Sequence, residues 1–461
     1  MKSSIARRAV IAMLVVALGL ICAMAVVSST TARVHADELD HVAAARFYET
    51  HWLPPPVADP RTLDSYSYSG MSYLNEWDIV YLLAGKFAAV VQRIVGNEVH
   101  AYRLFNVLLF SVLVYVAWWK GHATLLLSVL LLSPQIWYVF SYFNADAFAV
   151  FLAFLAAYEL TSPDSAFNDR ARALVARYWR LGLYIGLLVL SKRTFWIFAV
   201  FVLAYVALLE MWYRGHGGWR AGLRRMAVLA AIACAVALPR VCYDFYVNGS
   251  PSHKFDKMIA ASALYADDDF KPAVIGSRPH SAGVRLKSRG VGFYEAINGF
   301  WGPWFWVTQS VATSFGVYYY LLVYASLGFY VAAFSCIMLL VGTVLASTVR
   351  FGSSHDVTVC WLAGACGAAI VGLSMYHSWT IDFQPQGRYL FALFPILGIL
   401  LMRGRTYLNG RVTAGLVGAS FVLSTYSFVF VGLVSIPKSW EHVQSPKHPA
   451  LSLERDWRKA R

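Results

Sequence analysis

Acidic and polar side chains gather at two points of this sequence, each beside a long apolar run. Asp37, Glu38 and His41 follow the first run, and Asn144 and Asp146 open a later one. A carboxylate near a membrane surface can accept a proton from an attacking hydroxyl or bind a divalent metal. Alternatively, the acids could simply favour a helix N-terminus and Asn144 could cap its helix. Position alone leaves both interpretations open.

Four cations form a second group. Lys192, Arg193, Arg240 and Arg388 fall at the ends of apolar runs, on the side where short membrane loops usually lack positive charge. An arginine offers a two-pronged donor to a phosphate, although a single long cation can also reach lipid headgroups by snorkelling. Four cations on one face favour phosphate binding.

The composition indicates which elements must position these groups. The chain has 461 residues, of which 59% are hydrophobic and 14% charged; soluble domains are about 45–50% apolar and about 25% charged. Runs long enough to cross a bilayer must be helical, because loops and open sheet edges cannot cross lipid. We therefore expect an all-α integral membrane protein. The net charge of +14 then reflects membrane orientation and attraction to anionic lipid, not nucleic acid.

Hydropathy predicts about eleven transmembrane helices. The first run follows Arg7 and Arg8 and is longer than the apolar part of a secretion signal, so we expect it to be retained. The predicted spans are 9–29, 101–119, 123–142, 145–162, 179–191, 194–212, 226–244, 317–346, 357–376, 388–402 and 412–435.

Arginine placement predicts the orientation. With the N-terminus in the cytoplasm, the Arg-rich loops 163–178, 213–225 and 403–411 all fall inside. The candidate site residues then lie on the outer face of the membrane.

Residues 77–96 are apolar enough to suggest a further span, but their polar and apolar residues occupy opposite helical faces. We interpret them as an interfacial helix in the first outer loop, 30–100. A second outer loop covers 245–316, and the C-terminal tail 436–461 would also lie outside. The whole chain reads as one polytopic membrane domain.

Three short motifs in matching order resemble the GT-C glycosyltransferase superfamily. Asp37-Glu38-Leu39-Asp40-His41 follows the first span, Asn144-Ala145-Asp146 opens a later helix, and Gln384-Pro385-Gln386-Gly387-Arg388-Tyr389-Leu390 is followed by Pro395. The combination is most similar to uncharacterised bacterial polytopic membrane proteins related to that superfamily. The chain departs from many relatives at 73–77, where they carry a His-Pro-Pro run, and no large soluble C-terminal domain follows.

The resemblance implies sugar transfer from a polyprenyl-phosphate carrier at the outer face of a bacterial cytoplasmic membrane. The acceptor would be a lipid-linked, glycan or protein hydroxyl. Asp37, with Glu38 as the alternative, would act as base or metal ligand, and the metal requirement stays open. Arg388 would face the donor phosphate. We expect Lys192, Arg193 and Arg240 to help neutralise the phosphate charge. The expected supporting residues are His41, Asn144, Asp146, Gln386 and Tyr389.

Two other classes of function remain. A transporter or flippase of a polar lipid would place charges at mid-membrane and often shows internal repeats. The sequence has few charges within its predicted spans and no internal repeat. A non-catalytic assembly subunit could use the same charges to bind a partner. The sequence fixes neither the sugar, the acceptor nor the oligomeric state.

Overall fold

The computed structural model describes residues 4–30, 34–213, 218–275, 277 and 281–436. The predicted outer C-terminal tail therefore lies outside the described residues, apart from Ile436.

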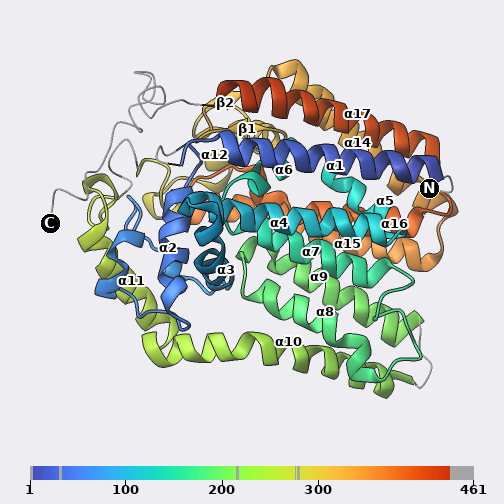
Figure 1. Cartoon of the computed structure of the whole chain (residues 1–461), viewed down its shortest axis with the longest axis horizontal. Coiled ribbons are helices and arrows are strands. Elements are labelled where there is room, and N and C mark those ends of the chain that lie inside the picture. The colour runs from blue at the N-terminus through green and yellow to red at the C-terminus, as the bar shows by residue number, and fades with distance from the viewer. Residues whose placement is uncertain (1–3, 31–33, 214–217, 276, 278–280, 437–461) are drawn as a thin grey trace.

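Long helices lie side by side in a bundle (Figure 1), with α1, α14 and α17 along one edge and α10 along the opposite edge. The expected all-α membrane class is confirmed, with one small β-hairpin added. The α-helices are α1 Ser4–Val27, α2 Glu38–Thr50, α3 Val80–Val95, α4 Glu98–Trp119, α5 Ala123–Leu127, α6 Pro134–Ser141, α7 Asp146–Thr161, α8 Leu174–Val189, α9 Trp196–Ala207, α10 Gly218–Asn248, α11 Pro251–Tyr265, α12 Phe293–Asn298, α13 Phe305–Ser314, α14 Leu327–Phe351, α15 Ser354–Thr380, α16 Leu393–Gly404 and α17 Gly410–Tyr426.

Short elements link these helices. The strands are β1 Val317–Tyr318 and β2 Val323–Tyr324, which pair antiparallel. The short 3₁₀ and π turns are η1 Pro60–Ser65, η2 Tyr73–Asn75, η3 Ser128–Leu131, η4 Arg193–Phe195, η5 Leu208–Tyr213, η6 Asp268–Phe270, η8 Lys287–Arg289, η9 Gly387–Leu390, η10 Ser427–Gly432 and η11 Leu433–Ser435.

The predicted number of spans is too high. Eight helices of the described chain are long and apolar enough to cross a membrane, or nine if the pair Ala123–Leu131 and Pro134–Ser141, bent by 88°, counts as one span. Helices occupy the predicted spans 145–162 and 179–191, but α7 and α8 have only 16 residues each. At 1.5 Å per residue each covers about 24 Å, less than a hydrocarbon core of about 30 Å.

The predicted span 317–346 is also corrected at its start. Residues 317–324 form the hairpin, whose turn holds Tyr319, Tyr320 and Leu321 at positive φ. The helix begins only at Leu327, because the Ser326 side chain accepts a hydrogen bond from the Phe329 amide and caps α14 there.

The two ends of the bundle differ in chemistry. At one end, on the left of Figure 1, lie α2, α3, α11 and the turn 381–390, and we call this the loop end. At the other end lie the N-terminus and the short connections 162–173, 352–353 and 405–409, and we call this the basic end. The Arg-rich loops of the sequence fall at the basic end. If this end faces the cytoplasm, as predicted, the loop end faces outward.

The predicted interfacial helix 77–96 corresponds to α3. Its Ala84, Gly85 and Ala88 are buried, and α3 packs on α2 and α4. Val90 and Ile94 on its other side are 66% and 84% exposed, so α3 presents an apolar face away from the protein. Its place at the membrane surface stays a prediction.

Candidate active site

Asp37 stands at the N-terminus of α2 but does not cap it. Its backbone is left-handed, with φ 58° and ψ 5°, and its side chain makes no capping hydrogen bond. A left-handed conformation costs a non-glycine residue about 1–2 kcal/mol. Its carboxylate faces Arg388, with Oδ2 3.8 Å from Nη2, and its place at the start of α2 is also the one that the helix N-terminus interpretation expected.

Arg388 is positioned by the glycine before it. Gly387 opens η9 against the end of α13, where a Cβ atom would lie 2.5 Å from Ser314 Cα and closer still to other Ser314 atoms. The Gly387 amide donates to Thr313 Oγ1 over 2.7 Å. Only glycine permits this close approach. The fixed turn then directs the Arg388 side chain, 15% exposed, into the loop end.

Asp146 faces the other terminal nitrogen of Arg388. It lies in the first turn of α7, is 2% exposed, and places Oδ2 3.8 Å from Arg388 Nη1. The chain before it is not helical from Tyr142 to Ala145, and buried backbone of this kind needs hydrogen-bond partners. Asn106 and Asn144 supply them, donating to the carbonyl of Tyr142 over 2.7 and 3.0 Å.

Asn144 is thus structural. Its Oδ1 also accepts the Ala147 amide of α7 over 3.1 Å, as the capping interpretation expected. Asp146 is the member of the Asn144-Ala145-Asp146 motif that faces the cation.

The guanidinium of Arg388 lies between two carboxylates without binding either closely. Both N···O distances, 3.8 Å, exceed the usual 2.7–3.2 Å of a hydrogen bond. Its Nε is buried and has no hydrogen-bond partner within the described chain. Arginine carries five N–H donors, so this side chain retains capacity for an oxyanion.

Glu38 is committed elsewhere. Both of its oxygens accept from Arg103 of α4, over 2.8 and 2.7 Å, and Oε1 also accepts the Phe143 amide. Burial alone would raise the pKa of Glu38, but Arg103 holds that pKa below its ordinary value. Arg103 also donates to the carbonyls of Ala25 and Ser28 at the end of α1. This buried pair joins α1, α2 and α4 and leaves Asp37 as the accessible acid.

His41 and Lys192 meet through an aromatic ring. The His41 ring stacks on Tyr73 at 4.0 Å, and Lys192 Nζ lies 5.1 Å from the centre of the Tyr73 ring. His41 Nδ1 also bonds the Tyr81 hydroxyl over 2.7 Å. Burial, followed by the charges of Lys192 and Arg388, lowers the pKa of His41 well below its ordinary value. His41 is therefore neutral and holds its neighbours in place.

The other two predicted cations have partners of their own. Arg193 pairs with Glu76 over 2.6 Å and is 69% exposed. Arg240 donates to the Tyr48 hydroxyl over 2.9 Å. Within the described chain neither forms an ion pair or hydrogen bond with Asp37 or Arg388. The close cluster therefore contains one of the four cations, Arg388, while Lys192 reaches His41 through the Tyr73 ring.

The turn that carries Arg388 has a second polar network. Gln384 donates to Asp382 over 2.5 Å and accepts from the hydroxyl of Tyr389. Burial raises the pKa of Asp382, and the nearby charge of Asp37 adds to the rise. For Gln386 the structure gives backbone contacts alone: its carbonyl accepts the Tyr389 amide over 3.1 Å.

Sequence reasoning missed Arg103 and Asp78. An arginine within an apolar run is costly unless paired, and this signal could have revealed Arg103. Asp78, read as part of a solvent-facing helix side, is 5% exposed. Burial raises the pKa of Asp78 to about 6; Glu76 and Asp146 add to the rise, and Lys192 and Arg193 oppose it.

The arrangement suits anion binding and proton acceptance. Across the described residues no group of three or more His, Cys, Asp or Glu side chains could hold a metal ion. The carboxylates of Asp37 and Asp146 face a guanidinium instead.

Comparison with known protein families identifies the family of this chain. Residues 38–267, about half of the chain, match the model of a family described as predicted membrane protein (DUF2142). The chain belongs to the DUF2142 family. It is a multi-pass integral membrane protein, and no curated protein matches it.

Solved structures similar to this DUF2142 chain share little sequence with it. ArnT from Cupriavidus metallidurans bound to undecaprenyl phosphate has a TM-score of 0.49 and 14% identity, over 94% of this chain and 68% of that one. The oligosaccharyltransferase AglB from Archaeoglobus fulgidus, in complex with an inhibitory peptide and a dolichol-phosphate, has a TM-score of 0.48 and 13% identity, over 96% of this chain and 58% of that one.

Proposed function

We propose that the protein is an inverting glycosyltransferase that uses a polyprenyl-phosphate sugar at the outer face of the cytoplasmic membrane. The acceptor is a hydroxyl group of a lipid-linked, glycan or protein substrate. The observation that carries the proposal is the partly exposed pair of Asp37 and Arg388, in which the arginine has unfilled donors and the acid has a left-handed backbone and no capping role.

Each group has a role in a single displacement. Asp37 accepts the proton of the acceptor hydroxyl, whose oxygen forms a bond to the anomeric carbon of the sugar. The bond from that carbon to the phosphate oxygen breaks, and its electron pair leaves with the carrier phosphate. Arg388 stabilises this developing negative charge, with Lys192 as the next cation. Attack opposite the leaving phosphate inverts the anomeric carbon.

The position suits such a donor. A prenyl chain must stay in lipid while its phosphate and sugar need polar partners. Arg388 lies in η9, shortly before the apolar helix α16, so its guanidinium lies at an end of the bundle and not in its middle. Asp37 and Asp146 each lie 3.8 Å from one of its terminal nitrogens.

The test is a transfer assay with purified protein and a labelled polyprenyl-phosphate sugar. We expect the wild type to release carrier phosphate, and Asp37→Asn to reduce the rate by about 10²–10⁴-fold, the usual contribution of a general base. Asn adopts left-handed backbone readily, so the variant keeps the fold. The matched control is Asp64→Asn, at an exposed acid of the same loop.

Full activity in Asp37→Asn would refute the role of Asp37. Movement of the labelled lipid across vesicles without cleavage would instead identify a transporter.

A further inference from the structure

Two spaces at the basic end meet at one arginine. An open polar cavity of about 470 Å³ lies between the ends of α7 and α16, and an apolar space of about 140 Å³ lies between α1 and α17. Arg405, which follows α16, lines both. Neither space belongs to the candidate active site, which lies at the other end of the bundle (Figure 1).

Two charged side chains that line the polar cavity, Arg403 and Asp356, are paired with each other. Arg403 binds Asp356 over 2.6 and 2.8 Å and donates to the Tyr205 hydroxyl over 2.8 Å. Its charge is therefore balanced. Arg405 is exposed and has no ion pair or hydrogen bond from its side chain to the rest of the described chain.

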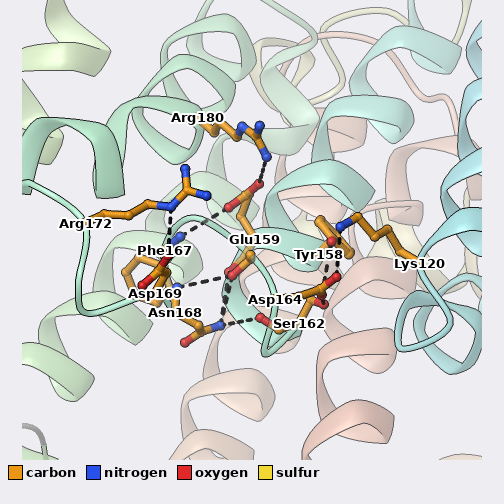
Figure 2. A network of polar contacts seen from close by, with 11 residues as sticks. Lys120, Tyr158, Glu159, Ser162, Asp164, Phe167, Asn168, Asp169, Arg172 and Arg180 are labelled. Atoms are coloured by element: carbon orange, nitrogen blue, oxygen red, sulfur yellow. Dashed lines mark hydrogen bonds and ion pairs between the residues drawn. The ribbon is translucent and has the colours of Figure 1, made fainter.

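The loop on the opposite wall is fixed by its own hydrogen bonds. Figure 2 shows Asn168 reaching back to the end of α7, where its amide donates to the carbonyls of Leu160 and Ser162 over 3.2 and 2.8 Å. Lys120 pairs with Asp164 over 3.0 Å in the same view. The cavity thus has preformed walls, and Arg405 is the cation left to meet a ligand.

The apolar space has one unsatisfied polar atom. Val10 and Met13 of α1, Leu125 of α5 and Val417 of α17 line it, together with Thr413. The Thr413 hydroxyl oxygen is buried and has no hydrogen-bond partner within the described chain. A buried hydroxyl without a hydrogen-bond partner is destabilising. An apolar ligand with a hydrogen-bond acceptor beside Thr413 would give this hydroxyl a partner.

We propose that these spaces bind one phospholipid with an anionic headgroup. The phosphate pairs with Arg405, the polar headgroup occupies the larger cavity, an ester carbonyl accepts from Thr413, and part of an acyl chain lies between α1 and α17. Charge complementarity supports this occupant, because the predicted orientation turns the basic end toward the leaflet in which anionic lipids attract Lys and Arg. A helix, about 10–12 Å in diameter with its side chains, would not fit the apolar space.

The experiment is native mass spectrometry of the purified full chain with added lipid. Phosphatidylglycerol is compared with phosphatidylcholine of identical acyl chains. We expect the wild type to prefer phosphatidylglycerol, and Arg405→Gln to reduce its binding by about tenfold, equivalent to about 1.4 kcal/mol. The matched control is Arg411→Gln, which removes one exposed arginine that lines neither space.

Further variants test the acyl-chain space and the independence of the site. Ala414 lines the apolar space, so Ala414→Phe should fill it and weaken phosphatidylglycerol binding while Arg405 is intact. If Ala414→Phe does not fold, as judged by size-exclusion elution, Ala414→Leu is used in its place. Arg388→Gln should bind phosphatidylglycerol as the wild type does, so this result is independent of the proposed enzymatic function.

Three outcomes would overturn the proposal. These are wild-type binding by Arg405→Gln, an equal loss in Arg411→Gln, and displacement of the lipid by inorganic phosphate, which would indicate a site for soluble anions.

Discussion

At the scale of the residue, the chain keeps one acid accessible and removes another from solvent. Asp37 and Glu38 are neighbours, yet Glu38 lies 2% exposed in a pair with Arg103 while Asp37 is turned toward Arg388. The left-handed backbone at Asp37 accompanies this difference: the Asp37 side chain faces Arg388, and the Glu38 side chain faces Arg103. Strained residues of this kind concentrate at functional sites, and here the strain places a carboxylate beside a cation with unfilled donors.

Asp78 should make stability depend on pH. Its pKa is about 6 in the folded protein and about 3.9 in an unfolded chain, so the folded state holds the proton more tightly. Stability therefore falls as pH rises from about 4 to about 6, by up to about 3 kcal/mol. We expect Asp78→Asn to unfold at a temperature near that of the wild type at pH 4 and at a higher temperature at pH 7.

The difference in unfolding temperature between the wild type and Asp78→Asn reports Asp78 alone, because the other titrating groups are present in both proteins. Burial lowers the pKa of His35 to about 3, which makes stability rise with pH across the same range. Glu76, Asp146, Lys192 and Arg193 are present in both proteins. A constant difference in unfolding temperature across pH 4–7 would show that Asp78 does not titrate there.

At the scale of the element, the Glu38–Arg103 pair ties three helices together. Removing one partner of a buried pair typically costs about 3–5 kcal/mol, because the other charge is left unpaired. We expect Glu38→Gln to lower the unfolding temperature in detergent markedly. Arg46→Gln, which breaks the half-exposed pair with Glu98, is the control and should have little effect. Equal shifts in the two variants would contradict the structural role of Glu38.

Gly387 should be needed for the geometry of Arg388. Gly387→Ala would press a Cβ into the backbone of Ser314, so we expect loss of transfer activity together with a destabilisation of about 1–3 kcal/mol. Gly364 of α15 has open space around its Cα, and Gly364→Ala is the matched control. Thermal unfolding and the transfer assay measure both effects. Wild-type activity in Gly387→Ala would show that this close contact is not required.

Much of the element order could be predicted from hydropathy, because spans need long apolar runs. The predicted spans 123–142 and 145–162 also leave a break before α7, but the hydrogen bond from Asn106 that satisfies its backbone could not be predicted, because Asn106 is distant in sequence. The hairpin at 317–324 consists of valine, leucine and tyrosine and runs directly into the apolar helix after it, so composition did not separate the two. The motifs containing Asp37 and Arg388 were visible in sequence, but the commitment of Glu38 to Arg103 and of Arg193 to Glu76 depends on folding.

At the scale of the whole molecule, the two ends have separate chemistry. The loop end holds the carboxylates and Arg388, and the basic end holds the Arg-rich connections and Arg405. The proposed reaction needs the loop end outside, where polyprenyl-linked sugars meet their acceptors. The lipid proposal needs the basic end at the cytoplasmic leaflet. One orientation satisfies both.

Labelling can determine this orientation. In a variant lacking the six native cysteines, a single cysteine at Asp64 should react with a membrane-impermeant maleimide in intact spheroplasts, and one at Arg411 should react only after lysis. Both positions are exposed, at opposite ends of the bundle. The reverse labelling pattern would put the candidate active site in the cytoplasm.

The central claim is that Arg388 receives the phosphate of the carrier while Asp37 acts in the chemical step. Equilibrium binding of polyprenyl phosphate to the wild type, Arg388→Gln and Asp37→Asn tests it most directly. We predict that Arg388→Gln loses at least about tenfold in affinity and that Asp37→Asn binds at least as tightly as the wild type. Wild-type affinity in Arg388→Gln would contradict the account.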